Sequence, residues 1–148
     1  MTEVTIKFVP ISEVLAVIDL VPEFDESKHQ REQEYQKRIA NKDPLIVVVF
    51  IDKKPAGFLI AYDKYSDGSY YCWRTGVIPE FRRKGVFSAL MSEFTKVAKE
   101  KGYSTMKIIT RNNRREMLTY LVKEGWCFIE MIPKETVEDS RMLLMKKI

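Results

Sequence analysis

Three consecutive basic residues and a glycine stand directly before a strong helical pattern, and together they could bind a phosphate. Arg82, Arg83 and Lys84 follow a strand-like run, and Gly85 opens the pattern that begins at Val86. The first turn of a helix attracts anions through unpaired N–H groups and the positive end of its dipole, and arginine can grip two phosphate oxygens. Gly85, without a side chain, would let a pyrophosphate approach this backbone. The plainer alternative is a glycine turn whose basic residues only aid solubility.

Other phosphate and metal motifs are missing from the sequence. It contains neither the Gly-Lys-Ser/Thr of a P-loop nor the G-x-G-x-x-G of a dinucleotide-binding fold. Cys72 and Cys127 lack the spacing of metal ligands, so we expect no metal, and both lie in apolar stretches where we expect reduced, buried thiols. The one histidine, His29, has no recognisable partner in its polar segment, so we interpret it as a surface residue.

Hydrophobic periodicity predicts the elements that must position the basic turn. Apolar, β-branched or alternating runs predict seven strands, and stripes with a period near 3.6 predict four helices. Ser27 and Gln30 have the spacing of a capping box for the second helix, which is so polar that we expect it to bury little. The strands are expected at 4–9, 45–51, 58–62, 70–78, 106–110, 126–132 and 141–147, and the helices at 10–21, 27–41, 86–102 and 114–124.

The order of these elements, β-α-α-β-β-β-α-β-α-β-β, indicates a mixed sheet. Turns join the strands of the first half, which should form an antiparallel meander. A helix joins strand 70–78 to strand 106–110, so this central pair should be parallel. We therefore predict an α/β fold with helices on both faces of the sheet, in one domain that covers residues 1–148.

Two segments resemble the signatures of the GNAT acetyltransferases. Val77-x-Pro79-Glu80-Phe81-Arg82-x-x-Gly85 is similar to motif A, V-x-P-x-[YF]-[QR]-x-x-G-x-[GA]. Asn113 and residues 117–126, which end Lys-Glu-Gly-Trp, look like the second signature, N-x-x-M-L followed by k-x-G-F. The resemblance, which extends to the order of elements, implies the acyl-CoA N-acyltransferase fold, with about seven strands and about four helices.

The resemblance also implies where acetyl-CoA, the co-substrate, would bind. Pantetheine would hydrogen-bond along the strand near Val77 and Ile78, and the pyrophosphate would rest on the N–H groups of residues 83–88. The strands that hold Val77 and residues 106–110 would splay apart to admit the cofactor. Phe87 stands where motif A ends in glycine or alanine, so its side chain should point away. The polar run 111–115 could contact the 3′-phosphate or cap the next helix, for which Asn113 is the natural cap. The implied cofactor-binding residues are Val77, Ile78, Arg82, Arg83, Lys84, Gly85, Val86, Phe87, Ser88 and Asn113.

The catalytic groups that are usual in the family have no clear counterpart. Some members carry a glutamate base six residues before the Val77 position, where this sequence has Tyr71. Many carry a tyrosine acid four residues before the second-signature glycine, where it has Leu121; Tyr120 is adjacent but turned about 100° around the helix. Tyr71 and Tyr120 are the candidates that remain. Tyr71 should share a strand face with Val77, either lining an acceptor site or packing in the core. A base acting through water could come from the acidic loop 23–26.

The resemblance implies an N-acetyltransferase that moves an acetyl group from acetyl-CoA to a primary amine by direct attack in a ternary complex. The acceptor would be a small-molecule or a protein amine, and family habit suggests a homodimer paired through the last strand, 142–146. Because both usual catalytic groups are missing, an alternative is a non-catalytic module of the same fold that binds or senses acyl-CoA.

Charge and composition set the remaining expectations. Residues 1–68 carry 9 Lys and Arg against 12 Asp and Glu, while residues 69–148 carry 16 against 9. The basic half suits a polyanionic ligand and the acidic half a cationic amine. No nucleic-acid-binding motif accompanies the charge, so nucleic acid is not the partner we expect. We see no signal peptide and no membrane-spanning run, and therefore expect a cytoplasmic protein without a membrane partner.

Overall fold

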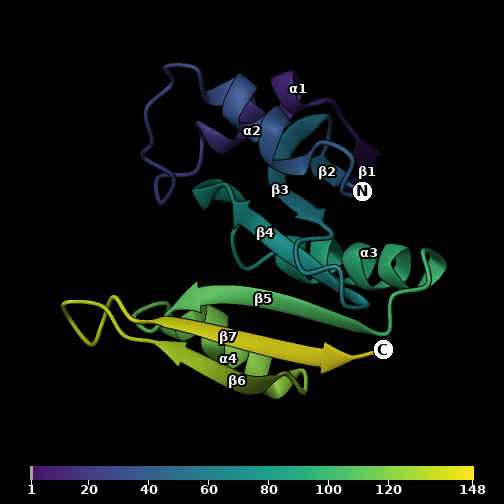
Figure 1. Ribbon diagram of the computed structural model, residues 1–148. Helices are drawn as coiled ribbons and strands as arrows, with labels where there is room; N and C mark the ends of the chain where they lie inside the picture. Colours follow the sequence, from purple (N-terminus) through teal and green to yellow (C-terminus); the bar gives the residue numbers. More distant parts are fainter. Residues whose placement is uncertain (1) are drawn as a thin grey trace.

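In the computed structural model, which describes residues 2–148, the chain forms a seven-stranded sheet with helices packed on it (Figure 1). The predicted α/β fold with a mixed sheet is confirmed. The strands are β1 (Val4–Phe8), β2 (Leu45–Ile51), β3 (Lys54–Tyr62), β4 (Ser69–Val77), β5 (Thr105–Arg111), β6 (Cys127–Ile132) and β7 (Arg141–Lys147). The helices are α1 (Ile11–Ile18), α2 (Arg31–Ile39), α3 (Val86–Glu100) and α4 (Arg115–Lys123), and a 3-10 turn, η1, covers Pro79–Phe81.

The sheet order is β1-β2-β3-β4-β5-β7-β6, so the central position belongs to β4. The first four strands are an antiparallel meander, as predicted from the turns that join them. β4 and β5 are parallel, but they pair only from Ser69 with Thr105 to Cys72 with Ile108. Beyond Cys72, β4 keeps β3 as its partner on one edge and, among the described residues 2–148, has no strand partner on the other. This early end to the pairing is what makes room for a site.

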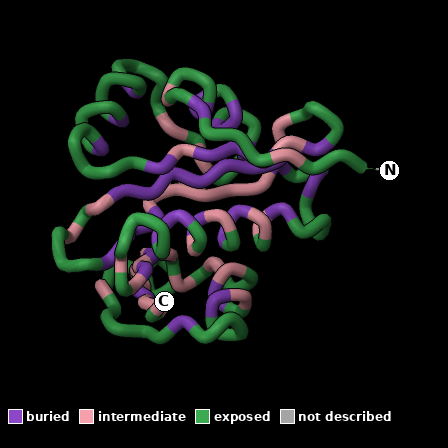
Figure 2. The backbone as a smooth tube through the Cα atoms, turned by 90° about the vertical axis from the view of Figure 1, so that its right-hand side faces the viewer, coloured by how far each residue is buried: buried purple, intermediate pink, exposed green. Residues whose placement is uncertain are grey.

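Figure 2 shows the sheet between two helical layers, with the buried residues concentrated in the strands. In β2 and β3 the runs 47–49 and 58–61 are fully buried, because helices cover both faces. In α3, Val86, Leu90, Phe94 and Val97 follow one another at intervals of three or four residues, so they form one apolar face against the sheet. Burial of each such side chain stabilises the fold by roughly 1.5–3 kcal/mol. Because Val86, the first residue of α3, belongs to this face, the packing holds the start of the helix against the sheet.

The segment before α2 differs from its prediction. The helix begins at Arg31, after Gln30 in a left-handed conformation with φ 56°. Ser27 does not cap it, since its hydroxyl accepts a hydrogen bond from the N–H of His29, at 3.3 Å. Arg31 instead donates to Asp19, at 2.8 Å, and this contact fixes the start of the helix. α2 also buries Arg31, Tyr35 and Ile39, one residue per turn, so the expectation that it buries little was wrong.

Three further predictions are corrected at the C-terminal side. β7 lies between β5 and β6, so both of its edges are used and it cannot pair with a second subunit. Cys127 is exposed, like its neighbours in the edge strand β6, whereas Cys72 in β4 is buried as expected. Asn113 does not cap α4: the position before the helix is occupied by Arg114, with no capping side-chain hydrogen bond.

Candidate active site

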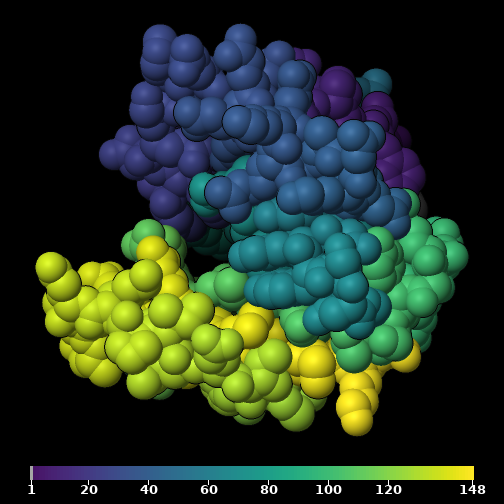
Figure 3. Space-filling view, viewed as in Figure 1, coloured from purple at the N-terminus to yellow at the C-terminus, as the bar shows by residue number. Residues whose placement is uncertain are grey.

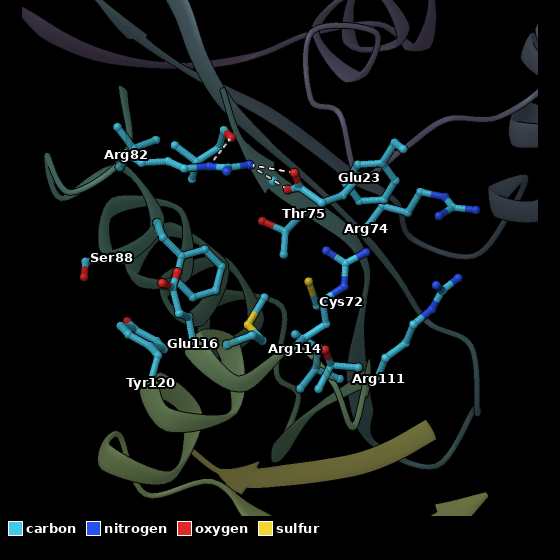
Figure 4. Close-up of a pocket in the computed structure, with 18 of the residues that line it drawn as sticks. Glu23, Cys72, Arg74, Thr75, Arg82, Ser88, Arg111, Arg114, Glu116 and Tyr120 are labelled. Atoms are coloured by element: carbon cyan, nitrogen blue, oxygen red, sulfur yellow. Dashed lines mark hydrogen bonds and ion pairs between the residues drawn. The ribbon is translucent and has the colours of Figure 1, made fainter. Parts of the chain in front are cut away.

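A cavity of about 770 Å³ opens where β4 and β5 separate. Its walls come from β4, β5, the start of α3, α4 and the loop that holds Glu23 and Phe24 (Figure 4). Figure 3 shows the molecule hollowed between the N-terminal part, in blue, and the C-terminal strands, in yellow-green. The cavity therefore reaches from the mouth of α3 to the far side of the central strands.

The mouth of α3 has an open backbone that could receive an anion. Gly85 precedes the helix with φ 78°, and no side chain caps the helix. The first helical hydrogen bond runs from the N–H of Ala89 to Gly85, and within residues 2–148 the N–H groups of Val86, Phe87 and Ser88 have no acceptor. A Cβ atom placed on Gly85 would meet nothing within 4 Å. Oriented N–H groups beside open space fit a phosphate.

Arg82 is engaged within the protein. Its guanidinium donates to both carboxylate oxygens of Glu23, at 2.8 and 2.7 Å, and its Nε donates to the carbonyl oxygen of Val77, at 3.3 Å. Arg82 thus joins the acidic loop to the end of β4. Its charge is already offset by Glu23, whereas Arg83, which also lines the cavity, forms no ion pair within residues 2–148.

Most of the implied cofactor-binding residues meet at this end of the cavity. Ile78 does not line it and is buried, Lys84 lies 5.7 Å from the ring centre of Phe81, and Asn113 lies in the loop before α4. The residues that do line the cavity are Val77, Arg82, Arg83, Gly85, Val86, Phe87 and Ser88.

Phe87 and Tyr120 form one aromatic wall. Their rings meet edge to face, with centroids 4.8 Å apart and planes at 75°, and both residues line the cavity. The expectation that Phe87 points away is therefore corrected: its ring rests on α4. Leu121 is fully buried, so Tyr120 is the one of this pair that faces the cavity. The orientation of α4 thus directs Tyr120, and not Leu121, toward the cavity.

Tyr71, the other catalytic candidate, lies away from the cavity. Its ring contacts Tyr62 and Tyr65, at centroid distances of 5.7 and 5.8 Å, in a separate apolar cluster. The cause is a register shift in which Ile60 pairs with Arg74 and Ala61 with Cys72, which leaves Trp73 as an extra residue. A bulge of this kind interrupts the alternation of faces along a strand. Tyr71 therefore does not share the cavity face with Val77, and burial raises the pKa of its hydroxyl.

The lining is strongly basic. Six arginines and two glutamates line the cavity. The polar run 111–115 had indicated Arg111 and Arg114, but sequence reasoning missed Arg74, Arg141 and Glu116, which come from three separate elements. Within residues 2–148 no group of three or more His, Cys, Asp and Glu side chains is placed to hold a metal ion. The cavity is thus suited to anionic ligands.

The separated parallel strands, with an open turn at the mouth of the following helix, define the acyl-CoA N-acyltransferase fold. The sequence profile of the acetyltransferase (GNAT) family matches residues 14–123, so the protein belongs to this family and is an acyltransferase. Its members transfer acetyl groups from acetyl-CoA to amines. No curated protein matches the sequence significantly. Within residues 2–148, no helix has the length and apolarity needed to cross a membrane.

Solved structures share the fold over nearly the whole chain. Ard1 from Thermoplasma volcanium superimposes with a TM-score of 0.80 at 19% identity, covering 98% of this chain and 97% of its own. The ribosomal-protein-S18-alanine N-acetyltransferase of Escherichia coli has a TM-score of 0.80 at 15% identity, covering 99% and 94%. The PaiA N-acetyltransferase of Thermoplasma acidophilum, in complex with coenzyme A, has a TM-score of 0.70 at 16% identity, covering 99% of each chain.

Proposed function

We propose that this protein acetylates a primary amine by direct attack on acetyl-CoA, with both substrates held in the cavity between β4 and β5. The observation that carries the proposal is the end of the strand pairing at Cys72 and Ile108, which joins the open turn at Gly85 to the interior in one continuous space. Direct attack requires the two substrates to meet in a single site, and a cavity that reaches both sides of the central strands allows this.

The cofactor end of the cavity is built mainly from backbone groups. We assign the pyrophosphate to the N–H groups of residues 86–88 and to the unpaired charge of Arg83. The pantetheine arm would lie along the edge of Trp73–Val77 that has lost its strand partner, where amide groups are free to bond it. Arg82 has a positioning role, because it holds Glu23 and Val77 together. We assign no direct contact to Ile78, Lys84 or Asn113.

The reaction needs only modest help with protons. The amine nitrogen attacks the thioester carbonyl carbon, the C–N bond forms as the C–S bond breaks, and the proton lost by nitrogen is balanced by the one that sulfur gains. A thiol near pKa 8.5 is a good leaving group at neutral pH. We assign the Tyr120 hydroxyl, which lines the cavity, as proton donor to the sulfur. Glu23 is engaged by Arg82, so we assign the amine proton to water. Tyr71, outside the cavity, has no role here.

Cys72 offers a covalent alternative. It lines the cavity and could form an acetyl-thioester before the amine arrives. Burial raises the pKa of its thiol above the ordinary value, so the reactive thiolate is scarce at neutral pH. This favours direct attack over a two-step transfer.

Titration calorimetry followed by initial-rate kinetics tests the proposal. Acetyl-CoA should bind the purified protein with micromolar affinity, and absence of binding would overturn the assignment. With a reactive amine, double-reciprocal plots should intersect, and Cys72→Ala should retain turnover. Parallel lines, with CoA released before any amine is added, would instead indicate an acetylated Cys72.

A further inference from the structure

Besides Arg82 and Arg83 near the mouth of α3, the cavity is lined by arginines from four other places in the chain. Arg74 comes from β4, Arg111 from the end of β5, Arg114 from the turn before α4, and Arg141 from the start of β7. Arg111 and Arg141 are register partners in adjacent strands. Figure 4 shows Arg74 and Arg111 on the side away from Ser88 and Tyr120. These four residues are called the arginine wall below.

Three members of the arginine wall form no ion pair in the part of the chain that the structure describes. Within residues 2–148, Arg111, Arg114 and Arg141 take part in none of the ion pairs and donate no side-chain hydrogen bond. Arg114 and Arg141 are also half-buried. Like charges gathered in a partly enclosed space repel one another, and the repulsion is relieved when an anion binds between them.

Arg74 is held rigidly at the upper end of the wall. Its guanidinium carbon lies 5.0 Å from the ring centre of Trp73, 5.4 Å from that of Phe24 and 5.8 Å from that of Tyr35. A terminal nitrogen lies 3.5 Å from Glu26, while its Nε is buried without an acceptor. A guanidinium fixed by aromatic faces keeps its orientation at low entropic cost.

We propose that the acceptor amine carries an anionic group, a carboxylate or a phosphate, which the arginine wall binds. The inference rests on the proposed function, since it takes the space opposite the α3 mouth as the acceptor side. The cofactor end already has N–H groups and Arg83 for its phosphates, so the wall is available to the second substrate. Guanidinium groups form charge-assisted, bidentate hydrogen bonds with carboxylates and phosphates.

The same positive charge would help to activate the amine. An ammonium group close to several guanidinium groups is disfavoured, so its pKa falls and more of the amine is present as the neutral nucleophile. This effect would assist the loss of the amine proton, for which Glu23 is not free because its carboxylate is engaged by Arg82. Anion binding and amine deprotonation would thus both follow from the arginine wall.

Matched pairs of amines test the proposal directly. CoA release is measured with amino acids against their carboxamides and with phosphoethanolamine against ethanolamine. At least one anionic amine should exceed its neutral partner by 10-fold or more in kcat/KM. Neutral amines that are acetylated equally well or better would overturn the inference, as would the absence of any discrimination.

Arg111→Gln separates the two substrates. It should raise KM for the anionic amine by about 10-fold, with a smaller effect on a neutral amine, and leave the Kd of acetyl-CoA unchanged. Arg115→Gln removes the same charge from a residue outside the cavity and should change none of these values. Arg141→Gln serves as a second variant if Arg111→Gln lowers the melting temperature.

The CoA 3′-phosphate is the rival anion for these arginines. If Arg111→Gln weakens acetyl-CoA but not acetyl-dephospho-CoA, the wall serves the cofactor and the inference fails while the proposed function stands. If the wild-type protein binds no acetyl-CoA at all, the proposed function fails instead.

Discussion

β4 and β5 form two very different regions at their two ends. At the paired end, Ser69–Cys72 is hydrogen-bonded to Thr105–Ile108, and the ring of Tyr70 stacks on Tyr103 at 4.5 Å. At the open end, Trp73–Val77 has lost this partner and borders a cavity lined by arginines. One pair of strands therefore supplies both a closed piece of core and an open site.

The difference between the two ends shows what a binding site demands of a sheet. Backbone groups that pair with a neighbouring strand stabilise the fold but are lost to ligands. At the open end the backbone groups on the facing edges of β4 and β5 stay free. The two strands are still held in the sheet on their other edges, because β3 pairs with β4 as far as Val77 and β7 pairs with β5 as far as Arg111. Changes at the open end should thus alter binding, and changes at the paired end should alter stability.

The largest effect is expected for Gly85→Glu, at the open end. A non-glycine residue at φ 78° costs roughly 1–2 kcal/mol, and the new carboxylate would repel the pyrophosphate. We expect acetyl-CoA affinity to fall by about 100-fold, or about 2.8 kcal/mol, in titration calorimetry. Gly102→Glu is the control, since Gly102 has φ 89° and open space but lies at the other end of α3. If the two variants bound acetyl-CoA with equal affinity, the open end would not be the cofactor site.

Gly57→Ala should destabilise the fold beneath the open end. A Cβ atom there would lie 2.8 Å from Val86 and 2.9 Å from the carbonyl oxygen of Gly76, and the backbone oxygen cannot move aside easily. We expect the free energy of unfolding to fall by about 2 kcal/mol, as measured by urea denaturation. Gly76→Ala, whose Cβ would meet only side-chain atoms at 3.1 Å, should cost less. If Gly76→Ala lowered the free energy of unfolding more than Gly57→Ala, the packing of α3 on Gly57 would not be the less adaptable of the two contacts.

How well the sequence predicted each region depended on how local the cause is. The turn at Gly85 and the stripe of α3 were predictable, because a glycine and an apolar period act over a few residues. The position of Tyr71 was not, because the bulge at Trp73 depends on how β3 and β4 pair. The start of α2 also escaped prediction, since an ion pair between Arg31 and Asp19 spans 12 residues. Contacts made by distant segments leave no short pattern in a sequence.

Tyr120→Phe separates catalysis from packing at the open end. The substitution keeps the ring against Phe87 and removes only the hydroxyl. We expect kcat to fall by about 10-fold, below the usual range for a general acid because the thiolate leaves readily, with the Kd of acetyl-CoA unchanged. Tyr71→Phe, the matched control, should leave kcat unaltered. If kcat fell for Tyr71→Phe and not for Tyr120→Phe, the proton donor would lie at the paired end and the assignment of Tyr120 would be wrong.

The smallest effect is expected for Asp67→Asn, which loosens the paired end. Asp67 accepts a hydrogen bond from Lys107, at 2.8 Å, and this contact, followed by that with Ser69, lowers the pKa of the carboxyl from 3.8 to about 2. A lowered pKa in the folded state means that the carboxylate stabilises the fold above about pH 4, and that this contribution disappears as the pH falls through 2.

Because the Asp67 side chain is 44% exposed, solvent screening reduces its contribution to about 0.5 kcal/mol. Denaturant unfolding should show that loss for Asp67→Asn at pH 7 and no difference from the wild type well below pH 2, while acetyl-CoA binds normally at pH 7. A difference that persists well below pH 2 would mean that the asparagine disturbs the turn itself. Normal binding with lowered stability would contrast with Gly85→Glu, whose largest expected effect is on the affinity for acetyl-CoA.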